Sequence, residues 1–522
     1  MADLELGSLG ASGINLDVSP KDLPPQVFNL SSNMDFKGTA VGPMVHTVSR
    51  ASRPAGLAVV HYMHSFYIAG DVLVWLVCGE TSAHLLYMGV WYDVTPAGML
   101  PSKKYQSTYI NGFVLINNGR QKPFYVDIFD PLVPMKTYDV WPDNQLCEVI
   151  ASLEGILIGF GPMDSSGIFN KALMLWSDIA DPGSLPTNFD YANPASRAGF
   201  TTMEGDEFPI TAVPLENRLQ LYRSRSIYDI AYIGGNLVFS TTRRQLQPNL
   251  LSPRAVCAFR RAASGSHFGI GDGYFFLFNG LDIIPLGIDE VTRTFFATLN
   301  RTYSNLVQVA HDNRLDEIWI AYPELGFTTC NKALIYDLNR KLWKIRELDQ
   351  LTTISTGFFP TSSDLVPWND IQGSWNDWIT PWKITYGVSE ISTLVFAESV
   401  GLTKIPDVGA PMSAYAQRLF CAFDSQDTTG RSNNRRNAVK YVTELFPEAN
   451  GRLRFRLGTS MTNTGFIDWT PWMPFNAYSE SKLDIALSGA FISFEIDNNL
   501  ESGSEAFELT GFSLLVKHGG RY

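Results

Sequence analysis

One phrase recurs through the first two-thirds of the chain: a turn signal followed by a short apolar run. The clearest copies begin at Asn111-Gly112, Glu154-Gly155, Glu216-Asn217, Asp272-Gly273 and Asp312-Asn313. They lie roughly 40 to 60 residues apart, which is the space that four short strands and their turns occupy. Such a unit is one blade of a β-propeller, so the recurrence predicts that architecture. In such a fold, we expect function to lie on surfaces and loops.

The length and composition agree with many strands and more than one core. The 522 residues exceed the roughly 250–300 residues that a single core usually supports. Aromatic residues make up 13% of the chain, and 42 glycines and 29 prolines supply turns. We therefore predict an all-β fold, in which a β-propeller of short antiparallel blades is joined to an additional C-terminal β-sandwich-like domain.

The pattern changes along the chain and predicts three parts. Residues 1–30 are rich in Gly, Ser and Pro and predict an extended N-terminal arm. Residues 31–405 predict the propeller, with loop insertions at 176–208 and 360–382. Residues 410–522 contain several runs that alternate apolar and polar residues, which is typical of half-buried antiparallel strands. This last part is expected to form the β-sandwich or platform domain.

The formal net charge of −12 limits the partners that the surface suits. Tight nucleic-acid binding needs a positive surface, although an acidic wall would let nucleic acid pass without sticking. Solubility is the simpler interpretation of the charge. The five cysteines are scattered and predict reduced thiols. The apolar run Val72 to Cys78 is too short to span a bilayer, so we expect no membrane anchor.

Motifs of catalysis and cofactor binding are mostly absent from the sequence. Gly269 to Gly273 is glycine-rich, but strand-like aromatic residues follow it, so no helix is expected there to hold a phosphate. His61 and His64 stand within a strand-like apolar context, which favours a core role over a metal site. We therefore predict no catalytic residues, no cofactor, no metal and no enzyme activity.

Three groups of residues are candidates for interface or gate loops. They are distinguished by aromatic or charged side chains within polar, turn-rich stretches. The candidates are Trp176, Asp178 and Asp181; the cluster Trp368, Trp375, Trp378 and Trp382; and the basic group Arg431, Arg435 and Arg436. A loop pinned by its indoles and a solvated basic loop are the alternatives for the last two groups. The functional interpretation of the tryptophan cluster is a carbohydrate platform or a partner-binding anchor. That of the basic group is a rim contact with an acidic neighbour or with DNA.

Several phrases, taken together, resemble the tail nozzle proteins of short-tailed bacteriophages, also called tail tubular protein B or packaged-DNA stabilisation proteins. The phrases are Gly13-Ile14-Asn15-Leu16-Asp17 with Leu23-Pro24-Pro25; Leu175-Trp176-Ser177-Asp178 with Ala180-Asp181-Pro182-Gly183; Tyr222-Arg223 to Ser226-Ile227-Tyr228 with Tyr232-Ile233-Gly234-Gly235; His311 to Trp319 with Tyr322-Pro323-Glu324, Cys330-Asn331-Lys332-Ala333-Leu334 and Trp343; and Gly519-Gly520-Arg521-Tyr522. The similarity spans most of the chain, although each phrase alone is short.

The resemblance implies a structural protein of the virion, located in the phage tail and assembled in the host cytoplasm. Family members form a homo-hexameric ring below a tail adaptor ring, the head-to-tail connector. The ring is a conduit that retains packaged double-stranded DNA and passes it during ejection without specific binding. Tail fibres dock on the side in some members. The resemblance implies no catalytic residue.

Two other functions are compatible with the sequence. The first is a carbohydrate-binding or glycoside-cleaving β-propeller of the tailspike or lectin type, which needs convergent carboxylates or exposed aromatic residues on one face. The second is a propeller scaffold in a cellular complex. The stretch from Trp176 to Phe208 is a candidate channel gate if it projects inward, and a contact with neighbouring subunits if it faces outward.

Overall fold

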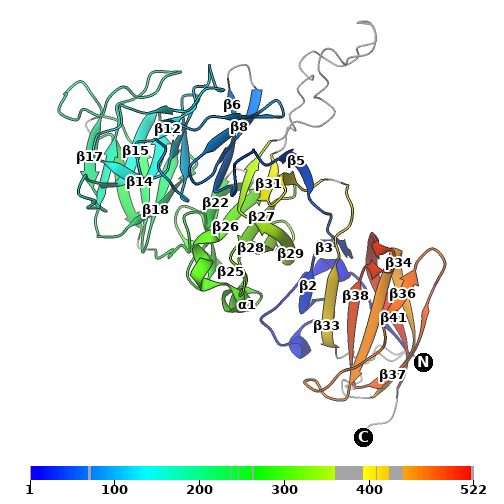
Figure 1. The fold of residues 1–522 in the computed structure, drawn as a ribbon. Helices are drawn as coiled ribbons and strands as arrows, with labels where there is room; N and C mark the ends of the chain where they lie inside the picture. The colour runs from blue at the N-terminus through cyan, green and yellow to red at the C-terminus, as the bar shows by residue number, and fades with distance from the viewer. Residues whose placement is uncertain are drawn as a thin grey trace, which may run out of the picture.

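The computed structural model describes residues 2–68, 72–235, 237–244, 246–261, 264–358, 392–406, 408–421 and 439–518. Within these ranges the chain forms two β domains that lie side by side, a seven-bladed propeller and a nearly closed, barrel-like sheet (Figure 1). We call the second one the barrel domain. The predicted all-β fold class, with a propeller and a further C-terminal β domain, is confirmed.

Six blades are meanders of four antiparallel strands that follow one another along the chain. Blade one contains β6 (Tyr62–Ile68), β7 (Val72–Cys78), β8 (Ala83–Tyr87) and β9 (Val90–Asp93). Blade two contains β10 (Gln106–Ile110), β11 (Phe113–Asn117), β12 (Phe124–Tyr125) and β13 (Lys136–Thr137). Blade three contains β14 (Leu146–Leu153), β15 (Ile156–Met163), β16 (Leu173–Trp176) and β17 (Gly199–Thr202).

The next three blades repeat this order. Blade four contains β18 (Pro209–Leu215), β19 (Arg218–Arg223), β20 (Ile227–Tyr232) and β21 (Phe239–Arg244). Blade five contains β22 (Val256–Arg261), β23 (Ser264–Ile270), β24 (Phe275–Phe278) and β25 (Ile283–Leu286). Blade six contains β26 (Gln308–Asp312), β27 (Glu317–Tyr322), β28 (Cys330–Asp337) and β29 (Leu342–Leu351). The first strands of most neighbouring blades contact each other, so they surround the axis of the propeller.

The seventh blade closes the ring with a strand from the other end of the propeller sequence. It contains β30 (Thr353–Gly357), β31 (Thr393–Glu398), β32 (Gly401–Lys404) and, outermost, β5 (Val48–Ser52). The start and the end of the propeller sequence are thereby hydrogen-bonded to each other. The propeller cannot open between its first and last blades without breaking this strand pair.

The recurrent phrase marks tight turns between strands, as expected. At Glu154-Gly155 both residues have positive φ, 51° and 73°, which matches the primed hairpin turns that suit twisted strands. In blades two, three, four and six the phrase joins the first strand to the second. In blade five, Asp272-Gly273 instead joins the second strand to the third. This shift of one strand, together with the long loop between β16 and β17 in blade three, explains why the spacing of the phrase is uneven.

The barrel domain is an 11-stranded sheet built from both ends of the chain. Its N-terminal strands are β1 (Ala2–Leu6), β2 (Leu30–Ser32), β3 (Met34–Lys37) and β4 (Ala40–Pro43). Its C-terminal strands are β33 (Tyr415–Cys421), β34 (Lys440–Ser460), β35 (Asp468–Trp469), β36 (Met473–Asn476), β37 (Leu483–Gly489), β38 (Phe491–Asp497) and β41 (Phe507–His518). A small hairpin, β39 (Asn499–Leu500) and β40 (Gly503–Ser504), lies between the last two.

The domain boundaries therefore differ from the expected ones. The predicted arm, residues 1–30, carries β1, which pairs along β41, and two short 3-10 helices, Leu9–Ala11 and Pro20–Asp22. Its proline-rich part is held by Arg418, whose guanidinium donates to the carbonyl oxygens of Pro20 and Leu23 at 2.7 and 2.6 Å. Sequence periodicity did not reveal this, because the pairing joins strands that lie hundreds of residues apart.

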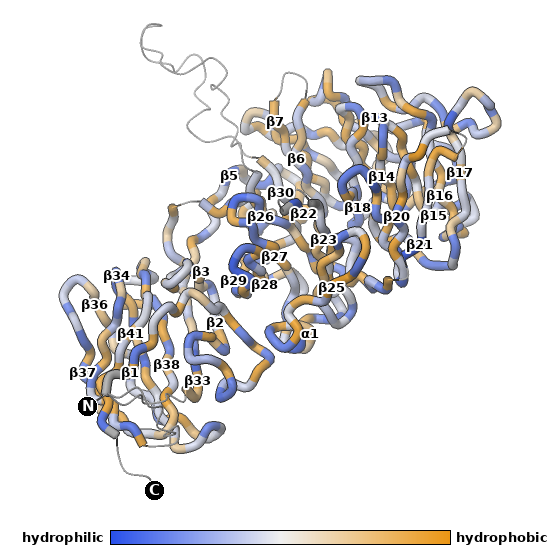
Figure 2. Tube along the Cα trace, turned by 180° about the vertical axis from the view of Figure 1, so that it is seen from behind, coloured by the Kyte–Doolittle hydropathy of each residue, from blue (hydrophilic) through white to orange (hydrophobic). Residues whose placement is uncertain are grey.

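Helix is scarce in the described chain, as the sequence indicated. The α-helix α1 (Thr292–Thr298) and a 3-10 helix, Arg301–Leu306, connect blades five and six. One hydrophobic cluster runs from the barrel core through this connection into blade six; Phe28, Phe36, Phe295 and Trp343 belong to it. Apolar stretches follow the strands of both domains in Figure 2. The two domains thus share part of their core.

Candidate functional site at the domain junction and the propeller axis

The chain crosses between the two domains twice, and the two crossings are paired. The His46 amide donates to the Ala410 carbonyl at 2.9 Å, and the Met412 amide donates to the Met44 carbonyl at 2.7 Å. Val45 and Pro411 form an isolated antiparallel bridge between them. A paired crossing is stiffer than two separate linkers, because each strand restrains the dihedral angles of the other.

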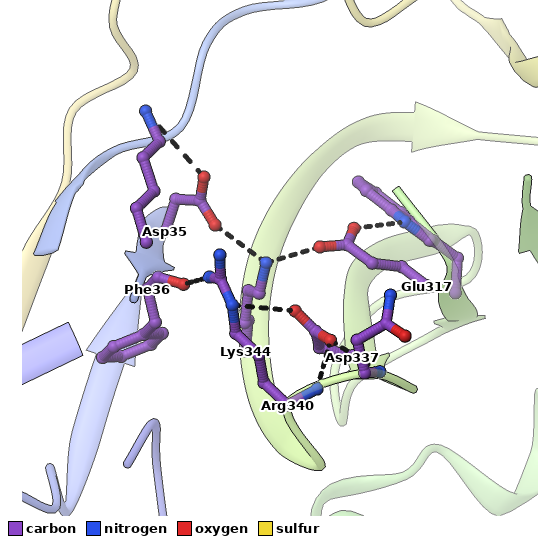
Figure 3. A network of polar contacts seen from close by, with 9 residues as sticks. Asp35, Phe36, Glu317, Asp337, Arg340 and Lys344 are labelled. Carbon is purple, nitrogen blue, oxygen red and sulfur yellow. Dashed lines mark hydrogen bonds and ion pairs between the residues drawn. The ribbon is translucent and has the colours of Figure 1, made fainter. Parts of the chain in front are cut away.

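A buried ionic network joins blade six to the barrel domain beside this crossing (Figure 3). The Lys344 ammonium on β29 lies 2.8 Å from the Asp35 carboxylate on β3 and 2.5 Å from the Glu317 carboxylate on β27. The Lys344 and Glu317 side chains are each only 5% exposed. Glu317 also accepts a hydrogen bond from the Trp319 indole at 3.2 Å. Lys344 is therefore a cation that bridges the two domains, and Arg340 beside it donates to the Phe36 carbonyl of β3.

Burial and charge act against each other in this network. Burial raises the pKa of Glu317, and the attraction of Lys344 only partly offsets it. Burial alone would lower the pKa of Lys344, but the carboxylates of Glu317 and Asp35 outweigh burial and raise it. Lys344 is thus held in its charged form. Removing one member of this ionic network should destabilise the fold, because the remaining charges then stay buried without an opposite charge.

Asn33 provides a second polar link at the junction. It has a left-handed φ of 56°, which Asn tolerates better than most residues. Its amide donates to the Ile345 carbonyl at 2.9 Å, and its side chain accepts from the Glu347 amide at 2.8 Å. The same side chain donates to the Ser413 carbonyl at 2.8 Å. Asn33 therefore connects the barrel domain, the outer strand of blade six and the returning crossing.

The segment from Gly13 to Asp17 forms a third contact between the domains. The Asp17 carboxylate accepts hydrogen bonds from the amides of Arg293 and Thr294 in α1, both at 2.8 Å. Gly13 has φ of +64°, and a Cβ at this position would lie 2.9 Å from the Trp343 carbonyl oxygen, so glycine fits both the turn and the close approach. The arm residues are thus wedged against the propeller.

The axis of the propeller is bridged at the end where the first strands begin. The Arg254 guanidinium donates to Gln308 Oε1 at 2.9 Å, to Thr353 Oγ1 at 2.5 Å and to the His61 carbonyl oxygen. These partners precede or begin the first strands of blades six, seven and one. Burial lowers the pKa of Arg254. One side chain thus ties four consecutive blades together at this end of their first strands.

A cavity of about 260 Å³ follows this bridge along the axis. It is lined by residues at or near the first strands of blades five, six and seven: Cys257, Ala258, Val309, Ala310, His311, Asn313, Ile354, Ser355 and Thr356. No carboxylate belongs to this lining. His311 Nε2 lies 3.0 Å from the Asp316 carboxylate at the turn after β26. The cavity is therefore polar, with one histidine held by an acidic partner.

The first predicted candidate group lies in blade three. Residues 199–202 of the predicted insertion are β17, so the loop proper runs between β16 and β17. The Trp176 indole donates to the Arg197 carbonyl at 2.7 Å and packs edge-on against Phe239. Trp176 is thus a core residue that anchors the return of the loop. Its position at the end of a strand explains why an interface role was expected instead.

Asp178 and Asp181 shape this loop. Burial alone would raise the pKa of Asp178, but hydrogen bonds from the amides of Arg197 and Ile179 and from neighbouring side chains lower it. Asp181 is exposed, and its carbonyl oxygen accepts from Asn111 Nδ2 at 3.0 Å. The loop is therefore fastened to blade two through Asn111. Among the described contacts, none extends it toward the axis, and whether it gates a channel stays a prediction.

The other candidates lie outside the described residues: Trp368, Trp375, Trp378, Trp382, Arg431, Arg435 and Arg436. Lys344, Asn33 and Arg254, which build the junction and the axis, were not singled out from the sequence, and Glu317 was included only as part of the phrase from His311 to Trp319. Lys344 and Arg346 read as the solvent-facing positions of an alternating strand. Only the partner domain, which is distant in sequence, turns that face inward.

The described chain offers little for a metal or a membrane. Within the described ranges, no three His, Cys, Asp or Glu residues gather as metal ligands. No helix of that part is long and apolar enough to cross a bilayer. The five cysteines are free thiols, four of them buried, and Cys257 is partly exposed. Burial raises the pKa of the Cys257 thiol to about 12.

No protein-family model and no curated protein matches the chain. Among solved structures, the chain is similar to one in the crystal structure of BBS1N in complex with ARL6DN, with 12% identity, a TM-score of 0.37 and coverage of 71% of this chain and 98% of that one. A chain of the mitotic checkpoint complex shows 10% identity, a TM-score of 0.37 and coverage of 70% and 98%. The β-propeller domain of Cps50 (Swd1) from Myceliophteria thermophila shows 8% identity, a TM-score of 0.37 and coverage of 59% and 92%. These likenesses are too distant to bear on function, and the propeller rests on its own strand pairing.

Proposed function

We propose that this protein is a structural subunit of a phage tail nozzle. In this proposal six copies form a ring below the tail adaptor ring, with tail fibres as further partners. The ring retains packaged double-stranded DNA and passes it into the host during ejection. The protein acts in the virion tail, is assembled in the host cytoplasm and catalyses no reaction.

One observation carries this proposal: phrases that resemble the nozzle family meet in space at the domain junction. The segment Gly13 to Asp17 contacts Trp343 and α1, although more than half of the chain separates them. Glu317, within the phrase from His311 to Trp319, binds Lys344, the residue that follows Trp343. The resemblance therefore concerns residues that hold two domains in one orientation. A fixed orientation is what a subunit of a rigid conduit requires.

The axis and the charge favour a passage between subunits over one through a subunit. Arg254 ties its own blade to three others by hydrogen bonds at the start of their first strands. Such tightly joined inner strands favour a conduit that is enclosed by several copies, rather than one that runs through a single propeller. A net charge of −12 suits such a wall, because it repels the phosphates of the passing DNA.

The lining of the axial cavity gives less support to the alternative function, cleavage of glycosides. Hydrolysis of a glycosidic bond normally uses two carboxyl groups that flank the bond. The axial cavity has none in its lining. The tryptophan cluster that motivated a carbohydrate platform lies outside the described residues, so binding of glycans stays open as the second outcome of the tests.

Electron microscopy of the purified protein, alone and bound to its virion, tests the nozzle proposal. We expect sixfold rings, or density at the distal end of a short tail. The variant Lys344→Met is a useful companion, because loosening the junction should make the rings irregular, whereas Lys482→Met on the exposed surface should leave them unchanged. Monodisperse monomers that are absent from any particle would refute the proposal and redirect work to a glycan screen.

A further inference from the structure

The axial cavity contains polar groups that the fold does not use. His311 Nε2 is bound to Asp316, but His311 Nδ1 has no hydrogen-bond partner among the described residues. The Ser355 hydroxyl also lacks a side-chain partner there. In addition, a first strand pairs on one side only, so part of its backbone N–H and C=O groups faces the axis. The cavity therefore presents hydrogen-bond donors and acceptors that the described fold leaves available.

A buried positive charge, the Arg254 guanidinium, is held next to the residues of the cavity by neutral hydrogen-bond acceptors alone. The hydrogen-bond acceptors around the Arg254 guanidinium are Gln308 Oε1, Thr353 Oγ1 and the His61 carbonyl, which are all neutral. Gln308 and Thr353 immediately precede Val309 and Ile354, which line the cavity. The guanidinium that they bind therefore lies next to the cavity, on the side where the first strands begin. A cation that is withdrawn from water and lacks a carboxylate attracts an anion strongly, because the local dielectric is low.

We propose that this axial cavity is a binding site for a small oxyanion such as phosphate. The Ser355 hydroxyl and the axis-facing backbone amides donate to its oxygens, and Arg254 supplies the balancing charge from below. His311, which Asp316 orients through Nε2, lines the site beside them. This role is independent of the proposed nozzle function.

Calorimetric titration of the intact protein with sodium phosphate, in a chloride buffer of matched ionic strength, tests this inference. We expect saturable binding of one phosphate per chain and a higher melting temperature at saturation, because a ligand that binds only the folded state stabilises it. Sulfate and acetate arms distinguish a site for tetrahedral oxyanions from one for carboxylates. If phosphate acts no differently from chloride, the inference is overturned.

Cys257 locates the site, because it lines the cavity and is the partly exposed thiol among five. Because burial raises the pKa of this thiol to about 12, its alkylation at pH 8.5 is slow in the folded protein. Saturating phosphate should slow it at least fivefold further and leave the alkylation of the denatured chain unchanged. Arg254→Gln should abolish this protection. Because Arg254 also joins blades, Ser355→Ala serves as the milder variant, with a severalfold weaker affinity for phosphate expected. Protection that persists unchanged in Ser355→Ala and in a folded Arg254→Gln would refute this placement.

Discussion

The propeller and the barrel domain differ in how far apart along the chain their partners lie. In six blades every strand pairs with a strand next to it in sequence, and only the last blade takes a distant strand, β5. The barrel domain joins residues 2–43 to residues 415–518 through β1, β2 and β4. Local pairing leaves a periodic trace in the sequence, whereas pairing between chain ends leaves none. The junction couples the two kinds of assembly.

The largest effect is expected where the two regions meet. Lys344→Met leaves Asp35 and Glu317 without their buried cation and should lower the free energy of unfolding by about 3–5 kcal/mol. Urea denaturation measures the loss, and hydrogen exchange should show faster exchange in β3 and β29. Lys482→Met, whose ammonium is 41% exposed beside Glu444, is the control and should change neither measurement. A stable Lys344→Met with unaltered exchange at the junction would mean that the domains are held by their shared core alone.

The second prediction concerns acid: as the pH falls, the propeller should unfold before the barrel domain. Burial lowers the pKa of His64 and His267 to about 4, from 6.5 in the unfolded chain, and both lie in blades. The unfolded chain therefore binds more protons between these values, so stability is present above pH 6.5 and falls toward pH 4. The loss is about 3 kcal/mol for each histidine.

Denaturation at a series of pH values, followed by hydrogen exchange, checks this order of unfolding. His267→Gln removes one titrating group and should reduce the slope between pH 6.5 and 4 by about 1.4 kcal/mol per pH unit. The raised pKa values of Asp312 and Glu317 act in the opposite sense, because these buried carboxyl groups favour their protonated forms. A slope that is unchanged in His267→Gln would contradict the buried neutral histidine.

An intermediate effect is expected where the barrel domain holds its N-terminal segment. Arg418→Ala removes charged hydrogen bonds to the Pro20, Leu23 and Pro24 carbonyls and should cost on the order of 2–3 kcal/mol. Limited proteolysis should then cut between residues 7 and 29, while the blades stay protected. Arg452→Ala, half exposed beside Glu505, is the matched control and should keep the parent cleavage pattern.

The smallest effect belongs to a single turn of the propeller. Gly155→Ala places a Cβ at φ of 73° and should cost about 1 kcal/mol, because only glycine adopts this region without strain. Gly7→Ala, where φ is ordinary and the space for a Cβ is open, should be neutral. Thermal denaturation of both variants measures the difference. Equal melting temperatures would show that this blade turn relaxes at no cost.

The parts that the sequence predicted are those that depend on local chemistry. Glu154-Gly155 predicts a hairpin turn from two adjacent residues, and the alternation of apolar and polar residues from Phe491 to Ile496 predicts a strand without any distant partner. The first hundred residues supply blade one and strand β5 of the seventh blade. The five recurrent phrases could not give the number of blades, because none of them lies in these two blades. Lys344 could not be foreseen, since its burial depends on β3, about 300 residues earlier. Trp176 was overinterpreted, because a strand-end indole looks the same whether it anchors a core or an interface.

The insertion of the propeller within the barrel domain also has a consequence for biosynthesis. Strands β1 to β4 leave the ribosome first, but β41, along which β1 pairs, comes last. At about 5–20 residues per second, roughly 25–100 seconds of translation separate β1 from β41. During that time unpaired strand edges are exposed while the blades fold, so the nascent chain is most prone to aggregation before its last strands appear. A chaperone that shields the first 43 residues during translation should therefore improve the yield of the whole protein more than one added after release.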